Sequence, residues 1–299
     1  MKSFHLILAF ISIVLVFITT VTMIAQPTKA LPYDSITEKS QVRIGLRYTS
    51  DYLYMGRSDS SKTPYLSPSI SYYHKSGFFL HGALSYLTNR EEGRIDMVTL
   101  SCGYDFYAKK VALGASVSEY FFSDFSYNVI AEMSTYLNAY AGYDFTLFTL
   151  YGDVSLGLSD GTDIFLGAEI DRTFYSLKNK LLIIPAVAMN AGTQHYYNAY
   201  YNYRSTQTGS WGGRAKGKGG MLSMPGTTQT SQVLESNKFN VLDYEAGLTI
   251  TYKIQNIRLF TSSTWTFPVN PSTLTNDQGT YQEDLKNGFF WSSGIRILL

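Results

Sequence analysis

The stretch Asn287–Leu299, which reads NGFFWSSGIRILL, decides the fold of this 299-residue chain. Its residues alternate between two sets. The first set is apolar apart from one serine and comprises Phe289, Trp291, Ser293, Ile295, Ile297 and Leu299. The second set carries the polar groups and comprises Phe290, Ser292, Gly294, Arg296 and Leu298. A period of two predicts a β-strand with an apolar medium on one side and a polar one on the other.

A strand of this kind at the end of a chain is what a bacterial outer-membrane barrel needs to close on its first strand. The pattern Ser292-x-Gly294-x-x-Ile297-x-Leu299 also resembles the C-terminal signal of such barrels, with Leu299 in the place of the usual terminal aromatic residue. The resemblance implies that the barrel-assembly machinery binds residues Ser292–Leu299.

A short basic end and an apolar run open the chain. Lys2 precedes residues 4–18, which are apolar except for one His and one Ser. This pattern predicts a secretory signal peptide over residues 1–25, with Ala30 as an alternative cleavage point. Residues 26–40 would then form a periplasmic tail. The alternative is an uncleaved inner-membrane anchor, because the run up to Ala25 is long enough to span a bilayer.

The composition excludes some classes of protein. The charge is nearly balanced, with 24 Lys and Arg against 23 Asp and Glu, so no nucleic-acid partner is expected. Charged residues make up only 16% of the chain, whereas aromatic residues make up 15% and include 25 Tyr. Such values are typical of proteins with much apolar outer surface and with aromatic belts at the membrane interface. The single Cys102 permits no internal disulfide.

Twelve alternating segments of about ten residues follow one another from residue 41 to the C-terminus. Their expected bounds are 41–49, 65–74, 78–88, 96–107, 111–120, 128–143, 147–158, 163–175, 181–197, 240–252, 257–267 and 287–299. The faces of segment 181–197 stay undetermined, because its first residues are apolar on both sides. About ten residues are enough for a tilted strand to cross the hydrocarbon core of a bilayer.

Short and long connections alternate between these segments. The short ones are 75–77, 108–110, 144–146, 176–180 and 253–256, and the long ones include 50–64, 89–95, 198–238 and 268–286. Such alternation is typical of a membrane barrel with short periplasmic turns and long outer loops. We therefore predict an all-β protein, a single transmembrane antiparallel up-and-down β-barrel of about 12 strands over residues 41–299, with a long outer loop at 198–238. The alternative is a soluble many-stranded sandwich, in which short and long connections would not alternate.

A family resemblance lies near the start of the barrel. Residues 50–60, SDYLYMGRSDS, are followed by Pro64 and by residues 71–79, SYYHKSGFF. This stretch resembles the N-terminal hairpin of the TorF-type porins, in which a similar strand, an aromatic-Arg-Gly loop and a Ser-Gly-Phe turn recur. Here the order is Gly56-Arg57 instead of Arg-Gly. The resemblance implies a barrel with a porin-like role and transfers no substrate.

Charged residues on the polar faces are the main candidates for function. Because side chains alternate between the two faces of a strand, four cations are expected to point inward, from strands that become neighbours after closure: Arg43, Arg47, Arg258 and Arg296. It points four carboxylates inward from the opposite wall: Glu132, Asp153, Glu169 and Asp171. Two opposed charged walls would line the pore and set its selectivity through a transverse field. The alternative is that these charges pair directly and fill a narrow lumen.

Enzymatic chemistry has little support in the sequence. Only His195 among the four His is expected near the outer rim, and no Ser partner is indicated, so we predict no catalytic residues. No His and Cys cluster suggests a metal site, and no cofactor is expected.

The patterns together predict a porin-like channel in the bacterial outer membrane for passive diffusion of small polar or charged solutes. The alternatives are an outer-membrane lipid-modifying enzyme, such as a lipase or acylase, and a sealed structural or adhesive barrel. Besides the assembly machinery, the expected partners are outer-membrane lipid, lipopolysaccharide and the solutes themselves. An oligomer is compatible with the sequence.

Overall fold

A computed structural model describes residues 39–58, 62–88, 93–124, 126, 128, 130, 133–159, 161–197, 232–234, 236–276 and 279–299. The predicted signal peptide, most of the predicted tail at 26–40 and most of the predicted loop at 198–238 lie outside these residues. Within the described ranges, no helix has the length and apolarity needed to cross a membrane.

The described residues form sixteen strands. Their bounds are β1 Gln41–Thr49, β2 Tyr65–Tyr73, β3 Phe78–Leu87, β4 Arg94–Ala108, β5 Val111–Phe122, β6 Thr135–Asp144, β7 Thr149–Leu158, β8 Thr162–Asp171, β9 Phe174–Ser176, β10 Leu181–Gly192, β11 Gln232–Leu234, β12 Asn240–Ile254, β13 Ile257–Pro268, β14 Thr273–Asn276, β15 Gly279–Gln282 and β16 Gly288–Leu298. Each predicted segment overlaps one strand of the barrel wall, and the first segment coincides with β1.

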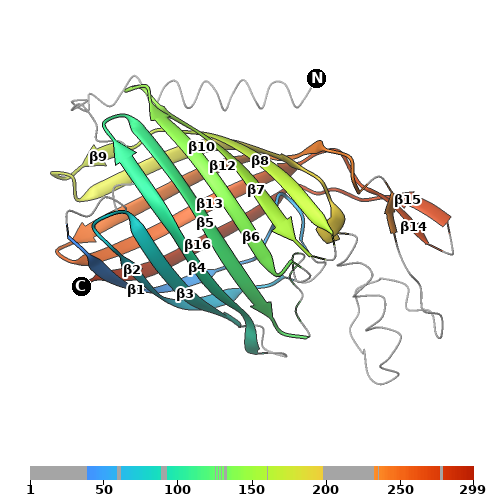
Figure 1. The fold of residues 1–299 in the computed structure, drawn as a ribbon, viewed down its shortest axis with the longest axis horizontal. Helices are drawn as coiled ribbons and strands as arrows, with labels where there is room; N and C mark the ends of the chain where they lie inside the picture. The colour runs from blue at the N-terminus through green and yellow to red at the C-terminus, as the bar shows by residue number, and fades with distance from the viewer. Residues whose placement is uncertain are drawn as a thin grey trace.

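The wall is one closed antiparallel sheet whose strands slant across the barrel (Figure 1). Strands adjacent in the chain pair from β1 to β8, and β10, β12, β13 and β16 continue in the same order. β9 continues β8 along the same side of β10, so the wall has twelve strands. The C-terminal strand β16 pairs with both β13 and β1 and thereby closes the barrel. The predicted up-and-down barrel is confirmed.

The outer face of the wall is apolar. Exposed hydrophobic side chains occupy alternate positions, for example Ile44 and Leu46 on β1, Ile164 and Leu166 on β8, and Phe289 and Trp291 on β16. Two aromatic pairs also lie on this face, Tyr48 with Trp291 and Trp265 with Phe289. A continuous apolar belt of this kind suits a wall that faces lipid, so the soluble sandwich is wrong.

One carboxylate departs from the apolar belt. Glu119 of β5 is paired in register with Leu100, whose side chain is exposed on the outer face. The Thr135 hydroxyl lies 2.9 and 3.0 Å from the two Glu119 carboxylate oxygens. This hydrogen bonding reduces the cost of placing a carboxylate on that face.

Tight turns connect the strands at one end of the barrel, which we call the short-turn end. These turns are 74–77, 109–110, 145–148 and 255–256. The turn between β2 and β3 requires glycine, because Gly77 has φ 104° and a Cβ there would clash with the Asp105 carbonyl oxygen. We call the opposite end, where the longer connections lie, the mouth.

Three predicted segments differ most from the strands in the structure. β6 begins at Thr135 and not at residue 128, because Ile130 and Met133 leave the wall and are buried in the mouth. The segment predicted at 163–175 is split into β8 and β9. The segment predicted at 181–197 ends at Gly192 after a bulge at Asn190/Ala191.

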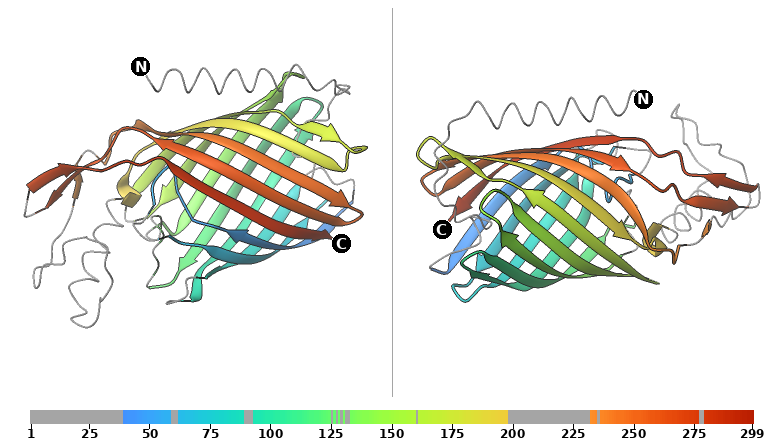
Figure 2. Two further views of the ribbon diagram at one scale, coloured as in Figure 1. Left: turned by 180° about the vertical axis from the view of Figure 1, so that it is seen from behind. Right: turned by 90° about the horizontal axis from the view of Figure 1, so that it is seen from above.

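A hydrophobic cluster fills part of the mouth. Its buried members come from several connections and strand ends: Ile130, Met133, Phe165, Tyr196, Tyr197, Val233, Leu242 and Leu274. Next to it, β11, β14 and β15 form a small separate sheet. Figure 2 shows β14 and β15 projecting beyond the barrel wall at this end.

Candidate functional site

The predicted basic residues lie on adjacent strands, as closure requires. Arg258 of β13 is directly opposite Arg296 of β16, and Arg296 is opposite Gly45 of β1. Lys253 of β12 is opposite Arg258, so three cations stand side by side on consecutive strands. Lys253 falls in the predicted connection 253–256, whereas in the structure it belongs to β12, which ends at Ile254.

Two of these arginines meet at an aromatic ring. The guanidinium carbons of Arg47 and Arg296 lie 5.2 and 5.7 Å from the centre of the Phe260 ring. Gly294 makes room for this ring, since a Cβ at Gly294 would lie 2.6 Å from Phe260 Cζ. Arg47 is exposed although it is on the inner face, so its guanidinium is open to the lumen.

Arg43 and Arg258 are held differently. Arg43 is buried, with its guanidinium carbon 3.9 Å from the centre of the Tyr73 ring and its Nε donating to Gln41 at 3.0 Å. Arg258 donates to the carbonyl of Gln255 at 2.7 Å, which lies in the β12–β13 turn. Both side chains are therefore engaged near the short-turn end, whereas Arg47 faces the open lumen.

Carboxylates line the wall formed by β7 and β8. Asp153 accepts hydrogen bonds from Ser155 Oγ at 3.3 Å and Asn138 Nδ2 at 3.4 Å. A Cβ at Gly167 would clash with its carboxylate, so that glycine gives Asp153 its space. Glu169 and Asp171 follow on β8, and Glu169 is exposed. The fourth predicted acid, Glu132, lies outside the described residues.

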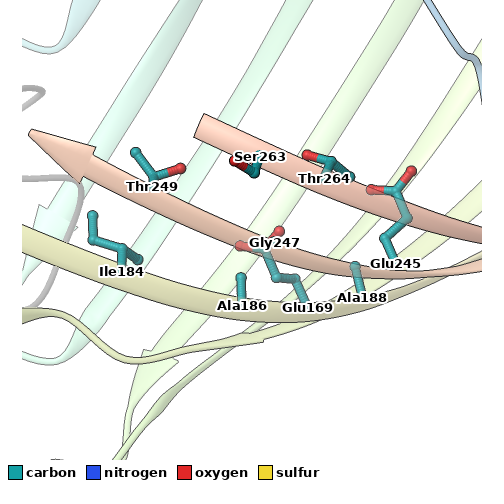
Figure 3. Close-up of a pocket in the computed structure, with 9 residues that line it drawn as sticks. All are labelled: Glu169, Ile184, Ala186, Ala188, Glu245, Gly247, Thr249, Ser263 and Thr264. Carbon is teal, nitrogen blue, oxygen red and sulfur yellow. The ribbon is translucent and has the colours of Figure 1, made fainter. Parts of the chain in front are cut away.

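A further carboxylate, Glu245 of β12, extends the acidic wall. Glu169 and Glu245 are both opposite Ala188 of β10, so they flank this small residue from either side. A cavity of about 210 Å³ opens between them, floored by Ala186, Ala188 and Gly247 (Figure 3). This arrangement could not be predicted from the sequence, because the first residues of segment 181–197 are apolar on both faces.

Three of the predicted carboxylates have no ion-pair partner among the described residues. Among the residues that the structure describes, no ion pair within 4.0 Å involves Asp153, Glu169 or Asp171. The prediction that the charges pair directly is therefore wrong for these three carboxylates. Arg47 and Glu169 are both exposed on the inner face, which requires solvent-accessible space inside the barrel.

The first long connection folds into the mouth. Tyr54 and Arg57 exchange two backbone hydrogen bonds of 2.8 and 3.0 Å around a tight turn. Met55 and Gly56 at its tip have positive φ angles of 47° and 74°. A Cβ at Gly56 would lie 2.8 Å from Pro268 Cβ, so the tip lies against the end of β13 at the mouth.

Arg57 fixes this turn in place. Its side chain is fully buried, and its guanidinium donates to the carbonyl oxygens of Met55, Leu242 and Asn270 at 3.2 Å each. Its Nε lies 3.6 Å from a carboxylate oxygen of Glu283. A buried guanidinium is stable only when its donors are satisfied, and these carbonyls come from both the turn and the wall.

Aromatic rings complete the packing in the mouth. The Tyr54 ring packs edge-on against Phe165 and Tyr196, with centroid distances of 5.7 and 5.3 Å. Burial raises the pKa of the Tyr54 and Tyr196 phenols above their ordinary value. The turn therefore narrows the mouth with neutral, rigid groups.

His195 is held in place by hydrogen bonds to neighbouring side chains. Its Nδ1 lies 3.1 Å from Asp163, and its Nε2 contacts the side-chain oxygen of Asn237. Asp163 is buried and also accepts from the backbone N–H groups of His195 and Tyr196 at 2.7 Å. In the described part of the chain, His195 has no serine as a hydrogen-bond partner, and no group of three His, Cys, Asp or Glu could hold a metal.

Comparison with known proteins yields structural neighbours only. No family model matches the chain, and no curated protein is similar to it in sequence. The KdgM porin has a TM-score of 0.45 and 9% identity, over 85% of this chain and 98% of its own. The NanC porin has a TM-score of 0.46 and 11% identity, over 86% of this chain and 98% of its own.

An outer membrane channel from Pseudomonas putida F1 has a TM-score of 0.46 and 10% identity, over 91% of this chain and 100% of its own. At identities this low, the function of the present chain has to be inferred from its own residues.

Proposed function

We propose that this protein is a porin-like channel of the bacterial outer membrane, through which small polar or charged solutes diffuse passively. The observation that carries the proposal is the exposure of Arg47 and Glu169 on the inner face of a closed barrel. Charged side chains that remain solvent-accessible inside such a wall are those of a water-filled lumen.

The two charged walls would give the channel its selectivity. Arg47 and Arg296 stand on β1 and β16, whereas Asp153, Glu169 and Asp171 stand on β7 and β8. Their separate placement creates a field across the lumen, because Asp153, Glu169 and Asp171 make no ion pair in the described part of the chain. A solute with separated charges would be oriented as it passes.

The same barrel suggests where the protein is located and which molecules it contacts. The apolar belt would contact outer-membrane lipid, and the long connections would meet lipopolysaccharide on the outside. We infer that β16 carries the recognition signal for the assembly machinery within Ser292–Leu299. The likeness of residues 50–79 to the TorF-type porins agrees with this proposal.

A sealed structural barrel is the second candidate, and one observation favours it. The turn at Tyr54–Arg57 and the cluster around Phe165 and Tyr196 occupy the mouth. If this packing leaves no continuous path, solutes would not cross.

Conductance across a planar bilayer separates the two candidates. For the refolded protein we expect ohmic current steps, and we expect Asp153→Asn and Arg47→Gln to shift the ion preference in opposite directions. Arg172→Gln is the matched control, because Arg172 contacts the Thr146 carbonyl in a short turn and should leave the preference unchanged. Absence of current from folded protein would rule out the channel and leave the sealed barrel.

A further inference from the structure

The cations of β12, β13, β16 and β1 form a concentrated positive patch on one side of the lumen. Lys253, Arg258 and Arg296 are direct cross-strand neighbours, and Arg47 stands one row further along, opposite Gly294. Like charges placed directly opposite each other on a sheet are destabilising. Because all four side chains carry the same sign, they also attract the same anion from the lumen.

The geometry at Phe260 makes one part of this patch a suitable site. Arg47 and Arg296 lie over the same ring, which fixes the position of both guanidinium groups. A guanidinium that stacks on a ring keeps its N–H groups at its edge, where they can donate in pairs to a carboxylate or phosphate. Arg47 is exposed to the lumen, so such a group can reach it.

We propose that Arg47, Arg296 and Phe260 form a binding site for the oxyanion group, carboxylate or phosphate, of a small solute. Arg47 and Arg296 donate hydrogen bonds to the oxyanion, and Phe260 positions them. Gly294 is part of the site because only a residue without Cβ lets the Phe260 ring lie between the strands. The role of the site in transport rests on the proposed channel function, whereas binding itself does not.

Isothermal titration of the folded, detergent-solubilised protein tests the binding. The probes are citrate, which carries carboxylates, and inorganic phosphate, each compared with chloride at equal ionic strength. We expect at least one probe to bind, and Arg47→Gln or Arg296→Gln to weaken its binding about tenfold, the loss expected for charged hydrogen bonds. Whichever probe binds identifies the oxyanion that the site prefers.

Further variants test whether binding needs the arrangement of the two arginines on the ring, or only their positive charge. Arg47→Lys keeps the charge without the planar fork and should restore only part of the affinity. Phe260→Leu keeps every charge and should also weaken binding, because the arginines lose their common ring. Arg172→Gln removes one cation elsewhere and should bind as the wild type does. Equal binding by the wild type and Arg47→Gln, or an equal loss in Arg172→Gln, would overturn the proposal.

The same proteins distinguish failure of the site from failure of the channel. Current without anion binding would overturn the site and leave the channel. Binding that depends on Arg47 without any current would leave the site and overturn the channel. Heat-dependent gel mobility of each variant checks folding, and if Arg47→Gln does not fold, Arg296→Gln and Phe260→Leu still decide.

Discussion

Single glycines determine where charged and aromatic side chains can lie in this barrel. Gly294 lies beneath the Phe260 ring, and a Cβ there would clash with the Leu46 carbonyl as well as with the ring. Gly167 has the same relation to the Asp153 carboxylate. The space that these two glycines leave open therefore determines where the Phe260 ring and the Asp153 carboxylate can lie.

Replacing Gly294 tests this relation. Because both a backbone oxygen and a ring would have to move, Gly294→Ala should lower the free energy of unfolding by about 1–3 kcal/mol. Gly247→Ala is the control, since a Cβ at Gly247 would lie 3.9 Å from its nearest neighbour and fits without movement. Urea unfolding followed by tryptophan fluorescence measures both, and equal stability of the two variants would contradict the expectation.

The element that most changes the lumen is the connection between β1 and β2. Asp51 stabilises its base by accepting from the backbone N–H groups of Tyr52 and Thr63, both at 2.9 Å. Arg57 secures its tip against the wall. With its base and tip fixed in this way, the part of the connection between Asp51 and Arg57 lies in the mouth.

Removal of the Arg57 guanidinium should free this element. Breaking a buried charged contact costs about 3–5 kcal/mol, which raises the undocked fraction by more than about a hundredfold. We expect Arg57→Met to expose Tyr52 and Tyr54 to chymotrypsin and to increase the conductance. Arg57→Lys should be intermediate, because it keeps the charge without the planar fork. Unchanged cleavage in Arg57→Met would show that other contacts hold the turn.

The tyrosines of the same element give it a pH dependence. Burial raises the pKa of Tyr52, Tyr54 and Tyr196, so the folded protein holds these protons more tightly than the unfolded chain does. Their contribution to stability is complete below the unfolded value of about 10 and decreases as the pH rises above it. Titration of tyrosinate absorbance should show fewer ionised tyrosines in the folded protein than in the urea-unfolded chain at pH values just above about 10. Coincident titration curves would contradict this.

At the scale of the whole molecule, closure by β16 links the two ends of the chain. In the described part of the chain, each wall strand is paired on both sides, except that the short extension β9 pairs only with β10. Closure therefore leaves little sheet edge open to lipid. We expect the folded protein to migrate faster than the boiled protein on a gel, because the closed barrel resists detergent until it is heated. Identical mobility before and after boiling would argue against a stable barrel.

Selectivity is also a property of the whole lumen. Charges on opposite walls act across open space, and salt screens them over about 10 Å at 0.1 M and about 3 Å at 1 M. The reversal potential in a salt gradient should therefore decrease towards zero as the mean ionic strength rises. A preference that does not change with salt would place the selectivity at a direct contact, such as the constricted mouth.

The sequence by itself determined the wall. Alternation with a period of two places one face in lipid and the other in water, and this local pattern needs no knowledge of distant residues. The ranges of β1 and β2, the closure by β16 and the inward placement of Arg47 and Arg296 could therefore be predicted. The predicted segment 128–143 begins too early, because Val129, Ala131 and Met133 alternate as they would in a strand. In the structure, Ile130 and Met133 are instead buried in the mouth.

Only the tertiary structure decided what occupies the lumen. The insertion of Tyr54–Arg57 depends on carbonyl groups of Leu242 and Asn270, which are far from Arg57 in the sequence. The site at Phe260 and the cavity between Glu169 and Glu245 depend on the register of strands that adjoin only after folding. Strand pattern is local, but register and docking are fixed by contacts between distant residues, and for this reason they become visible only in the folded barrel.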